Sequence, residues 1–153
     1  MNSLIIFGAK YLVYLIIAVA GIYFLIQPRD RQKQLALFGL FSLPLTYLIA
    51  KIADWLYYNP RPFISEHITP LFTHSADNGF PSDHTLISAA LAVVIFTHNK
   101  KLGTILMILA ILVGVSRVAA GVHHLIDIVA SLLIAIIVGA VVYNLTPKLK
   151  TKN

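Results

Sequence analysis

The sequence has no cysteine and few charged residues. Without cysteine it has no disulfide framework, no thiolate metal site and no cysteine nucleophile. Charged residues make up only 12% of the 153 positions, whereas 58% are hydrophobic. Lysine and arginine exceed acidic residues by 12 to 6, but they lie between apolar segments, which argues against a nucleic-acid partner. The composition therefore predicts a membrane protein.

Five apolar segments predict an all-α fold, a polytopic bundle of membrane helices forming a single domain over residues 1–153. The expected spans are about 4–26, 35–56, 84–98, 102–119 and 124–146. The first lacks the basic region and cleavage site of a signal peptide, so we expect it to be retained as a span. The third is short, and we expect it to begin within the stretch FPSDHT.

The placement of cations predicts the orientation of the bundle. Eight cations fall in alternate connections, which the positive-inside rule assigns to the cytoplasm: Arg29, Arg31, Lys33, Lys100, Lys101, Lys148, Lys150 and Lys152. We therefore expect the N-terminus outside and the C-terminus inside. The other four cations and five of the six acidic residues then map near the outer face.

Three polar stretches meet at that face and contain groups suited to a phosphate. They are YYNPRPF (57–63), FPSDHT (80–85) and SRVAAGVHHLID (116–127). Arg61 and Arg117 offer planar sets of donors that match a tetrahedral oxyanion. Ser82 precedes the third span, where an N-cap hydroxyl and free backbone N–H groups favour an anion. We expect these three residues to bind the substrate phosphate.

Two histidines and an aspartate complete a candidate catalytic site for phosphoryl transfer. His123 and Asp127 are four residues apart, so the carboxylate is expected to orient the imidazole and leave its other nitrogen as a nucleophile. His84, from another helix, is placed to protonate the leaving oxygen. No carboxylate cluster suited to Mg²⁺ is evident, so we expect no metal and no cofactor, with the arginines holding the transition-state charge.

These motifs resemble those of a known family. PRP, PSDH and SR-x5-H-x3-D are similar to the three motifs of the type 2 phosphatidic acid phosphatase superfamily. The full stretches look most like its bacterial undecaprenyl-diphosphate phosphatase branch, the bacitracin-resistance type. The resemblance covers about residues 40 to 140. It implies that His123 forms a phosphohistidine, that Asp127 orients it, and that His84 first acts as acid and later activates water.

Four further residues are possible substrate-binding or supporting groups. The superfamily's first motif usually opens with a lysine seven positions before its arginine, where this chain has Asp54. Lys51, one helical turn earlier, is a candidate substitute, and Asp54 is expected either to pair with it or to position an arginine. Asp83 stands where the second motif usually has glycine. His124 faces about 100° away from its neighbour on a helix, which favours a supporting or interfacial role.

The loop between the second and third expected spans is too long for a simple connection in so small a protein. It contains Glu66, His67, His74 and Asp77, and it fits either a lid over the lipid headgroup or a solvated loop.

We expect a phosphatase of the bacterial inner membrane whose site faces outward and takes a lipid phosphate from the outer leaflet. The resemblance implies undecaprenyl diphosphate as the substrate, in the recycling of the cell-wall carrier. Phosphatidylglycerol phosphate and lipid A phosphate remain alternatives. A transporter could use His84, His123 and Asp127 as a proton relay, although a relay should spread through the membrane depth. A metal site at His84, His123 and His124 is disfavoured because adjacent histidines on a helix point apart.

Overall fold

Residues 2–146 are described in this computed structural model, and within that range the regular structure is helical, without strands. The elements are α1 (Asn2–Lys10), α2 (Leu12–Leu25), α3 (Arg29–Leu56), α4 (Pro62–Ser65), α5 (Asp83–Phe96), α6 (Lys100–Ala119) and α7 (Leu125–Leu145). The expected all-α class is confirmed. Helix α3 contains the predicted second span, 35–56, but it begins earlier, at Arg29, because it includes the polar residues that precede the apolar run.

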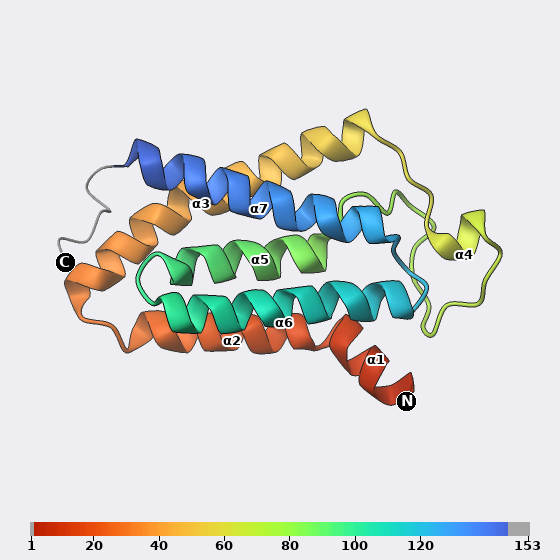
Figure 1. Ribbon diagram of the computed structural model, residues 1–153, viewed down its shortest axis with the longest axis horizontal. Helices are drawn as coiled ribbons and strands as arrows, with labels where there is room; N and C mark the ends of the chain where they lie inside the picture. The colour runs from red at the N-terminus through yellow and green to blue at the C-terminus, as the bar shows by residue number, and fades with distance from the viewer. Residues whose placement is uncertain (1, 147–153) are drawn as a thin grey trace.

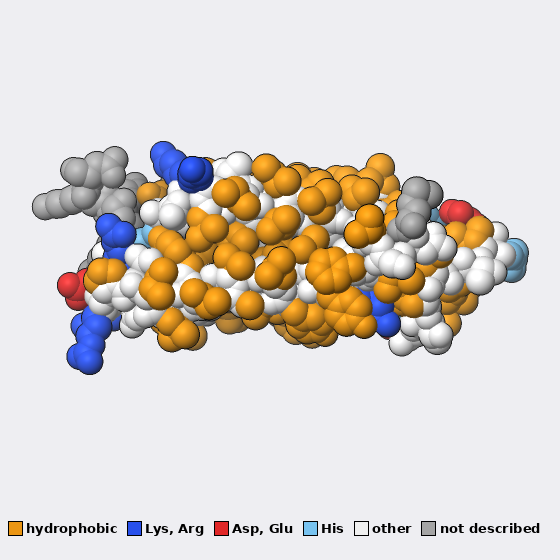
Figure 2. All heavy atoms as spheres, turned by 90° about the horizontal axis from the view of Figure 1, so that it is seen from below, with side chains coloured by type: hydrophobic (Ala, Val, Ile, Leu, Met, Phe, Trp, Pro, Cys, Tyr) orange, Lys and Arg blue, Asp and Glu red, His pale blue; other side chains and the backbone are white. Residues whose placement is uncertain are grey.

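The helices form an apolar cylinder with polar ends. By their length and composition, α3, α6 and α7 can each cross a membrane, the bent pair of α1 and α2 makes a fourth candidate, and α5 is a shorter apolar helix. Figure 2 shows hydrophobic side chains covering the middle of one face, with lysine and arginine gathered mainly at one end. Such a surface, on helices long and apolar enough to span a bilayer, is typical of a protein embedded in lipid.

Helix α5 lies at the centre of the bundle, between α6, α7 and α3 (Figure 1). More than half of its 14 residues are buried, among them Ala89, Ala90 and Ala92. These small side chains allow the surrounding helices to approach closely. At about 1.5 Å per residue α5 is only about 21 Å long, and it starts short of the ends of α6 and α7 (Figure 1). The polar motifs meet in front of the N-terminus of α5.

Glycines on α6 and α7 complete this close packing. A Cβ atom at Gly114 would collide with the side chain of Ile128, and one at Gly139 would collide with Val93. Bulk at either position must therefore separate two helices of the bundle.

The predicted first span, 4–26, is not one straight helix. It consists of α1 and α2, which meet at Tyr11 with a bend of 46°. The carbonyl of Ala9, beside the break, accepts a hydrogen bond of 3.0 Å from Nη1 of Arg117 on α6. Gly8 also packs directly against Ser116. A side chain that binds a backbone carbonyl is a recognised cause of a helix kink, and here it comes from a residue far along the chain.

Candidate active site

A cavity of about 280 Å³ lies at the N-terminus of α5. Its walls come from the end of α3, from residues 57–82 (hereafter the site loop), from α5 and α6, and from the turn 120–124. The lining residues are Ala50, Lys51, Asp54, Arg61, His74, Asp77, Asn78, Phe80, Pro81, Asp83, His84, Arg117 and His123. Most of them are polar, in a chain that is largely apolar. The structure thus brings segments from three parts of the sequence into one pocket.

His123 presents one ring nitrogen to this cavity and uses the other to contact Asp127. The distance from its Nδ1 to Asp127 Oδ2 is 3.2 Å. An ionised carboxylate only accepts hydrogen bonds, so Nδ1 carries the proton and Nε2 keeps its lone pair. Both side chains are buried, with 3% and 0% of their surfaces exposed. Burial lowers the pKa of His123 to about 4, against the opposing hydrogen bond to Asp127, so the ring is neutral at neutral pH.

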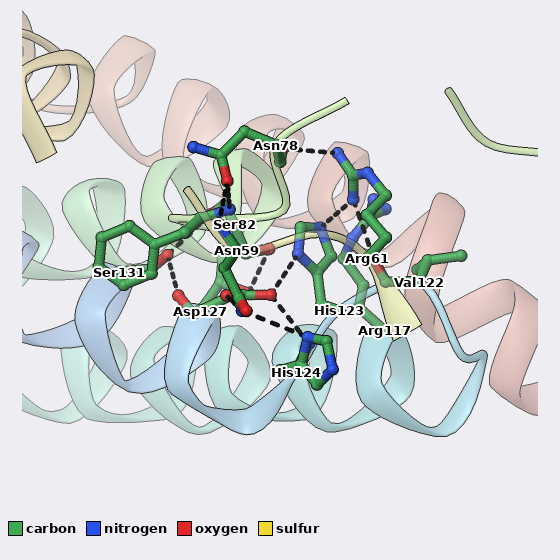
Figure 3. A network of polar contacts seen from close by, with 12 residues as sticks. Asn59, Arg61, Asn78, Ser82, Arg117, Val122, His123, His124, Asp127 and Ser131 are labelled. Carbon is green, nitrogen blue, oxygen red and sulfur yellow. Dashed lines mark hydrogen bonds and ion pairs between the residues drawn. The ribbon is translucent and has the colours of Figure 1, made fainter. Parts of the chain in front are cut away.

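Arg61 donates a hydrogen bond to that lone pair. Its Nη1 donates to Nε2 of His123 over 3.1 Å and to the carbonyl of Val122 over 2.9 Å. Its Nε donates to Asp77 over 2.8 Å. Burial would raise the pKa of Asp77, but the hydrogen bond from Arg61 and its charge outweigh this effect and leave the pKa below its ordinary value. Figure 3 shows Arg61 pointing at the imidazole from the opposite side to Asp127. The guanidinium therefore occupies a position next to the nitrogen that would attack a phosphate.

Arg117 brings a second guanidinium to the cavity from the last turn of α6. It is 2% exposed, donates to the carbonyl of Ala9, and donates from Nη2 to Nε2 of His74 over 2.8 Å. Its Nε has no hydrogen-bond partner within residues 2–146. No carboxylate forms an ion pair with it in that part of the chain. A buried arginine without an anionic partner is costly, and an anionic ligand would relieve that cost.

The second motif starts α5 at the cavity wall. Ser82 occupies the N-cap position, as expected, but its hydroxyl does not cap the backbone. Instead Ser82 Oγ accepts a hydrogen bond of 3.2 Å from the side chain of Thr85. The expected side-chain cap is therefore not formed, and the hydroxyl of Ser82 contacts the side chain of Thr85 instead. Asp83 and His84, the first two residues of α5, both line the cavity.

The comparison with known families decides the relationship of this chain. The PAP2 superfamily model matches residues 35–151, which is most of the chain. The chain belongs to the PAP2 superfamily.

Individual relatives of this PAP2 protein agree with that assignment. Undecaprenyl-diphosphatase BcrC of Bacillus subtilis is 31% identical over 98% of this chain and 77% of its own length. The crystal structure of Aquifex aeolicus LpxE matches with a TM-score of 0.74 at 26% identity, over 94% of this chain and 87% of that one. A PAP2 type phosphatidylglycerolphosphate phosphatase from Bacillus subtilis matches with a TM-score of 0.63 at 25% identity, over 99% and 79%. The chain is a multi-pass PAP2 membrane lipid phosphatase.

Asp54, at the usual place of the PAP2 first-motif lysine, pairs with Lys51. Lys51 Nζ lies 3.7 Å from Asp54 Oδ2, and both residues line the cavity. Asp54 Oδ1 also accepts a hydrogen bond of 2.7 Å from Nδ2 of Asn78. Asp54 thus contacts Lys51, as one of the two interpretations expected, and it ties the end of α3 to the site loop. Lys51 stands 46% exposed at the rim, available to an incoming anion.

Asn59 is a site residue that sequence reasoning missed. Its Nδ2 lies 2.7 Å from Asp127 Oδ1 and 3.2 Å from Nδ1 of His124. His124 in turn lies 3.2 Å from Glu66 through Nε2, and its backbone N–H donates to Asp127 over 2.8 Å. His124 therefore supports the pair formed by His123 and Asp127 (Figure 3). The only signal in the sequence was the position of Asn59 two residues before the arginine of the first motif.

His74 is the second residue whose place the sequence did not reveal. It was expected only within a lid or a solvated loop, yet it lines the cavity and contacts Arg117. Its ring lies edge-on to that of His123, with 6.3 Å between the ring centroids. The site loop is held over the cavity in part by a hydrogen bond of 3.0 Å from the N–H of Leu71 to the carbonyl of Ala120.

The polar residues of this PAP2 site do not form a metal cluster. Within residues 2–146, no group of three or more histidine or carboxylate side chains is arranged to hold a metal ion. The cavity carries two guanidinium groups instead, which suit an anion.

Proposed function

We propose that this phosphatase hydrolyses undecaprenyl diphosphate to undecaprenyl phosphate and inorganic phosphate through a phosphohistidine at His123, without a metal ion. One observation carries the proposal: the unprotonated Nε2 of a buried, carboxylate-oriented histidine faces a cavity that also holds two arginines. The choice of lipid is supported by the name of the relative from Bacillus subtilis, an undecaprenyl-diphosphatase.

In the first step Nε2 of His123 forms a bond to the terminal phosphorus. The bond from this phosphorus to the bridging oxygen breaks, and its electron pair leaves on that oxygen, to which His84 donates a proton. Attack requires that Arg61 give up its hydrogen bond to Nε2 and turn its donors to the phosphate. Arg61 and Arg117 then neutralise the charge that develops on the phosphoryl oxygens. Asp127 stabilises the positive charge on the imidazole.

In the second step water attacks the phosphohistidine. His84 accepts the proton from this water, the bond between phosphorus and Nε2 breaks, and inorganic phosphate leaves. Ser82 and Lys51 complete the phosphate site in this proposal, Ser82 through the start of α5 and Lys51 as a cation at the rim, and the carboxylate of Asp83 supports the site as part of its wall. The long polyprenyl tail remains in the bilayer while its diphosphate enters the polar cavity.

We further propose that the whole chain, residues 1–153, forms one domain in a bacterial inner membrane, with the cavity at the extracytoplasmic face and the lipid taken from the outer leaflet. The supporting observation is the distribution of charge. The cations Arg29, Arg31, Lys33, Lys100 and Lys101 lie at the end of the bundle opposite to the cavity, where the positive-inside rule puts the cytoplasm.

A second candidate substrate is phosphatidylglycerol phosphate. It is supported by the match to the PAP2 type phosphatidylglycerolphosphate phosphatase, which extends over 99% of this chain. The same His123 chemistry applies, with a monoester as the scissile group.

The test is phosphate release by the purified protein in detergent with excess EDTA, from both lipids. We expect the wild type to cleave undecaprenyl diphosphate faster, and His123→Ala to be inactive while the exposed loop variant His67→Asn keeps its activity. Acid-labile phosphate trapped on the wild type and absent from His123→Ala would identify the intermediate. Retained activity in His123→Ala, or abolition of wild-type activity by EDTA, would refute the mechanism.

A further inference from the structure

His74 has no role in the mechanism above, although it lies in the same cavity. It is half-buried on the site loop, and its Nε2 lies 2.8 Å from Nη2 of Arg117. On its other side Nδ1 lies 3.4 Å from the carbonyl of Ser75, a long contact. The rings of Phe72 and His123 flank it at centroid distances of 6.4 and 6.3 Å. A loop histidine is thus held against one of the two guanidinium groups proposed to bind the phosphate.

The contact with Arg117 fixes the protonation state of His74 in the free enzyme. A guanidinium can only donate hydrogen bonds, so Nε2 of His74 accepts and carries no proton. Burial lowers the pKa of His74, and the charges of Arg61 and Arg117 lower it further, while the Ser75 carbonyl and Asp77 oppose them. The imidazole is therefore neutral at neutral pH while the cavity holds no anion.

A bound phosphate reverses the influence of the two arginines on His74. The guanidinium of Arg117 turns its donors to the phosphate oxygens, which removes the hydrogen bond that His74 accepted. Two negative charges then lie between the arginines and offset their effect on the imidazole. The groups facing His74 are Arg61 from the site loop, Arg117 from α6, His123 from the turn 120–124, His84 from α5, and Asp77 from the site loop itself. None of them is an anion that could replace the phosphate, apart from Asp77, which is already paired with Arg61.

We propose that His74 is a further substrate-contacting histidine: when a phosphate group enters the cavity, the imidazole takes one proton from solvent at Nε2 and donates it in a hydrogen bond to a phosphate oxygen. The proposal rests on the proposed function, because it requires the cavity to be the phosphate site. Nδ1–H continues to point at the Ser75 carbonyl, so the charged ring has an acceptor on each side. Phosphate binding is then coupled to the uptake of a proton from water.

A purely structural role for His74 predicts something else. If the ring served only to hold Arg117 in place, the glutamine variant would replace it well, because the glutamine carbonyl can accept from the same guanidinium. Proton uptake on phosphate binding would then be the same in both proteins.

The experiment is calorimetric titration of inorganic phosphate into the purified protein at pH 7, in two buffers of different ionisation enthalpy. The difference between the buffers counts the protons taken up per phosphate bound. We expect the wild type to take up about one more proton than His74→Gln, since the ionisation of phosphate itself is common to both proteins. We also expect affinity to fall on the order of tenfold in the variant, through loss of a charge-assisted hydrogen bond. His67→Asn, a change at an exposed histidine of the same loop, should behave like the wild type.

Equal proton counts in the wild type and in His74→Gln would overturn the proposal, whatever the change in affinity. If the variant fails to fold, NMR of the ¹³C-labelled wild type decides: addition of phosphate at pH 7 should move the His74 ring signals to those of an imidazolium, and unchanged signals refute the idea. Neither readout needs turnover. A wild type that fails to cleave undecaprenyl diphosphate would refute the proposed substrate, while the proton count would still decide the role of His74.

Discussion

Asn59 provides the sharpest test of how this site is held together. The substitution is Asn59→Ala, which removes the Nδ2 donor located 2.7 Å from Asp127 Oδ1. The other carboxylate oxygen keeps its contacts with the ring of His123 and the backbone of His124, at 3.2 and 2.8 Å. Asp127 is fully buried, so Oδ1 would lose the one partner it has among the described residues and would find no bulk water.

The size of the effect follows from that geometry. A hydrogen bond to a charged group is worth about 1.5–3 kcal/mol, and a buried acceptor left without its donor carries that loss. If all of it were expressed in the transition state, kcat would fall roughly 10- to 150-fold. Any part expressed as lower stability appears as a lower melting temperature and reduces the kinetic effect. We expect KM to change little, because Asn59 does not line the cavity.

The assay is steady-state hydrolysis of undecaprenyl diphosphate together with thermal unfolding in the same detergent. Asn144→Ala removes an exposed asparagine at the far end of α7 and should match the wild type in both measurements. The isosteric Asn59→Asp places a second carboxylate against Asp127 and should be worse than alanine. A kcat for Asn59→Ala within about twofold of wild type and an unchanged melting temperature would refute the reasoning.

Three more expectations follow from the structure. The pKa of His123 is lowered from 6.5 to about 4, so the folded state loses stability as the pH falls through this range. Between pH 7 and 5 the free energy of unfolding of the wild type should therefore fall by about 2 kcal/mol more than that of His123→Gln. An identical pH dependence of thermal unfolding in the two proteins would contradict this. Gly114→Val should destabilise the fold by about 1–3 kcal/mol through its clash with Ile128, whereas Gly21→Ala, which has open space, should stabilise it by roughly 0.5–1 kcal/mol; equal melting temperatures would disprove the packing argument. Lys51→Met should raise KM by up to about fivefold at unchanged kcat, with the difference shrinking in high salt, and a salt-independent change would exclude a role in attracting the substrate.

The helical fold and the polar end of the bundle could be predicted from hydropathy and charge, because both are local properties of the sequence. The bend at Tyr11 could not. Residues 4–26 contain no proline, and their single charged residue, Lys10, does not by itself predict a bend at Tyr11. The kink coincides with a contact between Ala9 and Arg117, which are more than a hundred positions apart. Only the packed structure brings them together.

The motif residues could be placed in one pocket because they lie at helix ends on the same predicted side. The residues between them could not be assigned, since an asparagine or histidine in a polar loop resembles any solvated side chain. Asn78 illustrates this: its amide donates to Asp54 and to the carbonyl of Tyr57, and its Oδ1 accepts from the backbone of Asn59. Asn78 matters to the site because of these hydrogen-bond partners. The conformation of the loop brings them together, and the sequence around Asn78 does not reveal them.

The hydrogen bond from Arg61 to His123 bears on the design of covalent inhibitors. A neutral electrophile that reaches the cavity meets a nitrogen whose electron pair is already engaged by a guanidinium. An effective compound needs an anionic group that draws this arginine aside before its reactive atom arrives. A screen of electrophiles that lack such a group will therefore underestimate how readily this histidine can be modified.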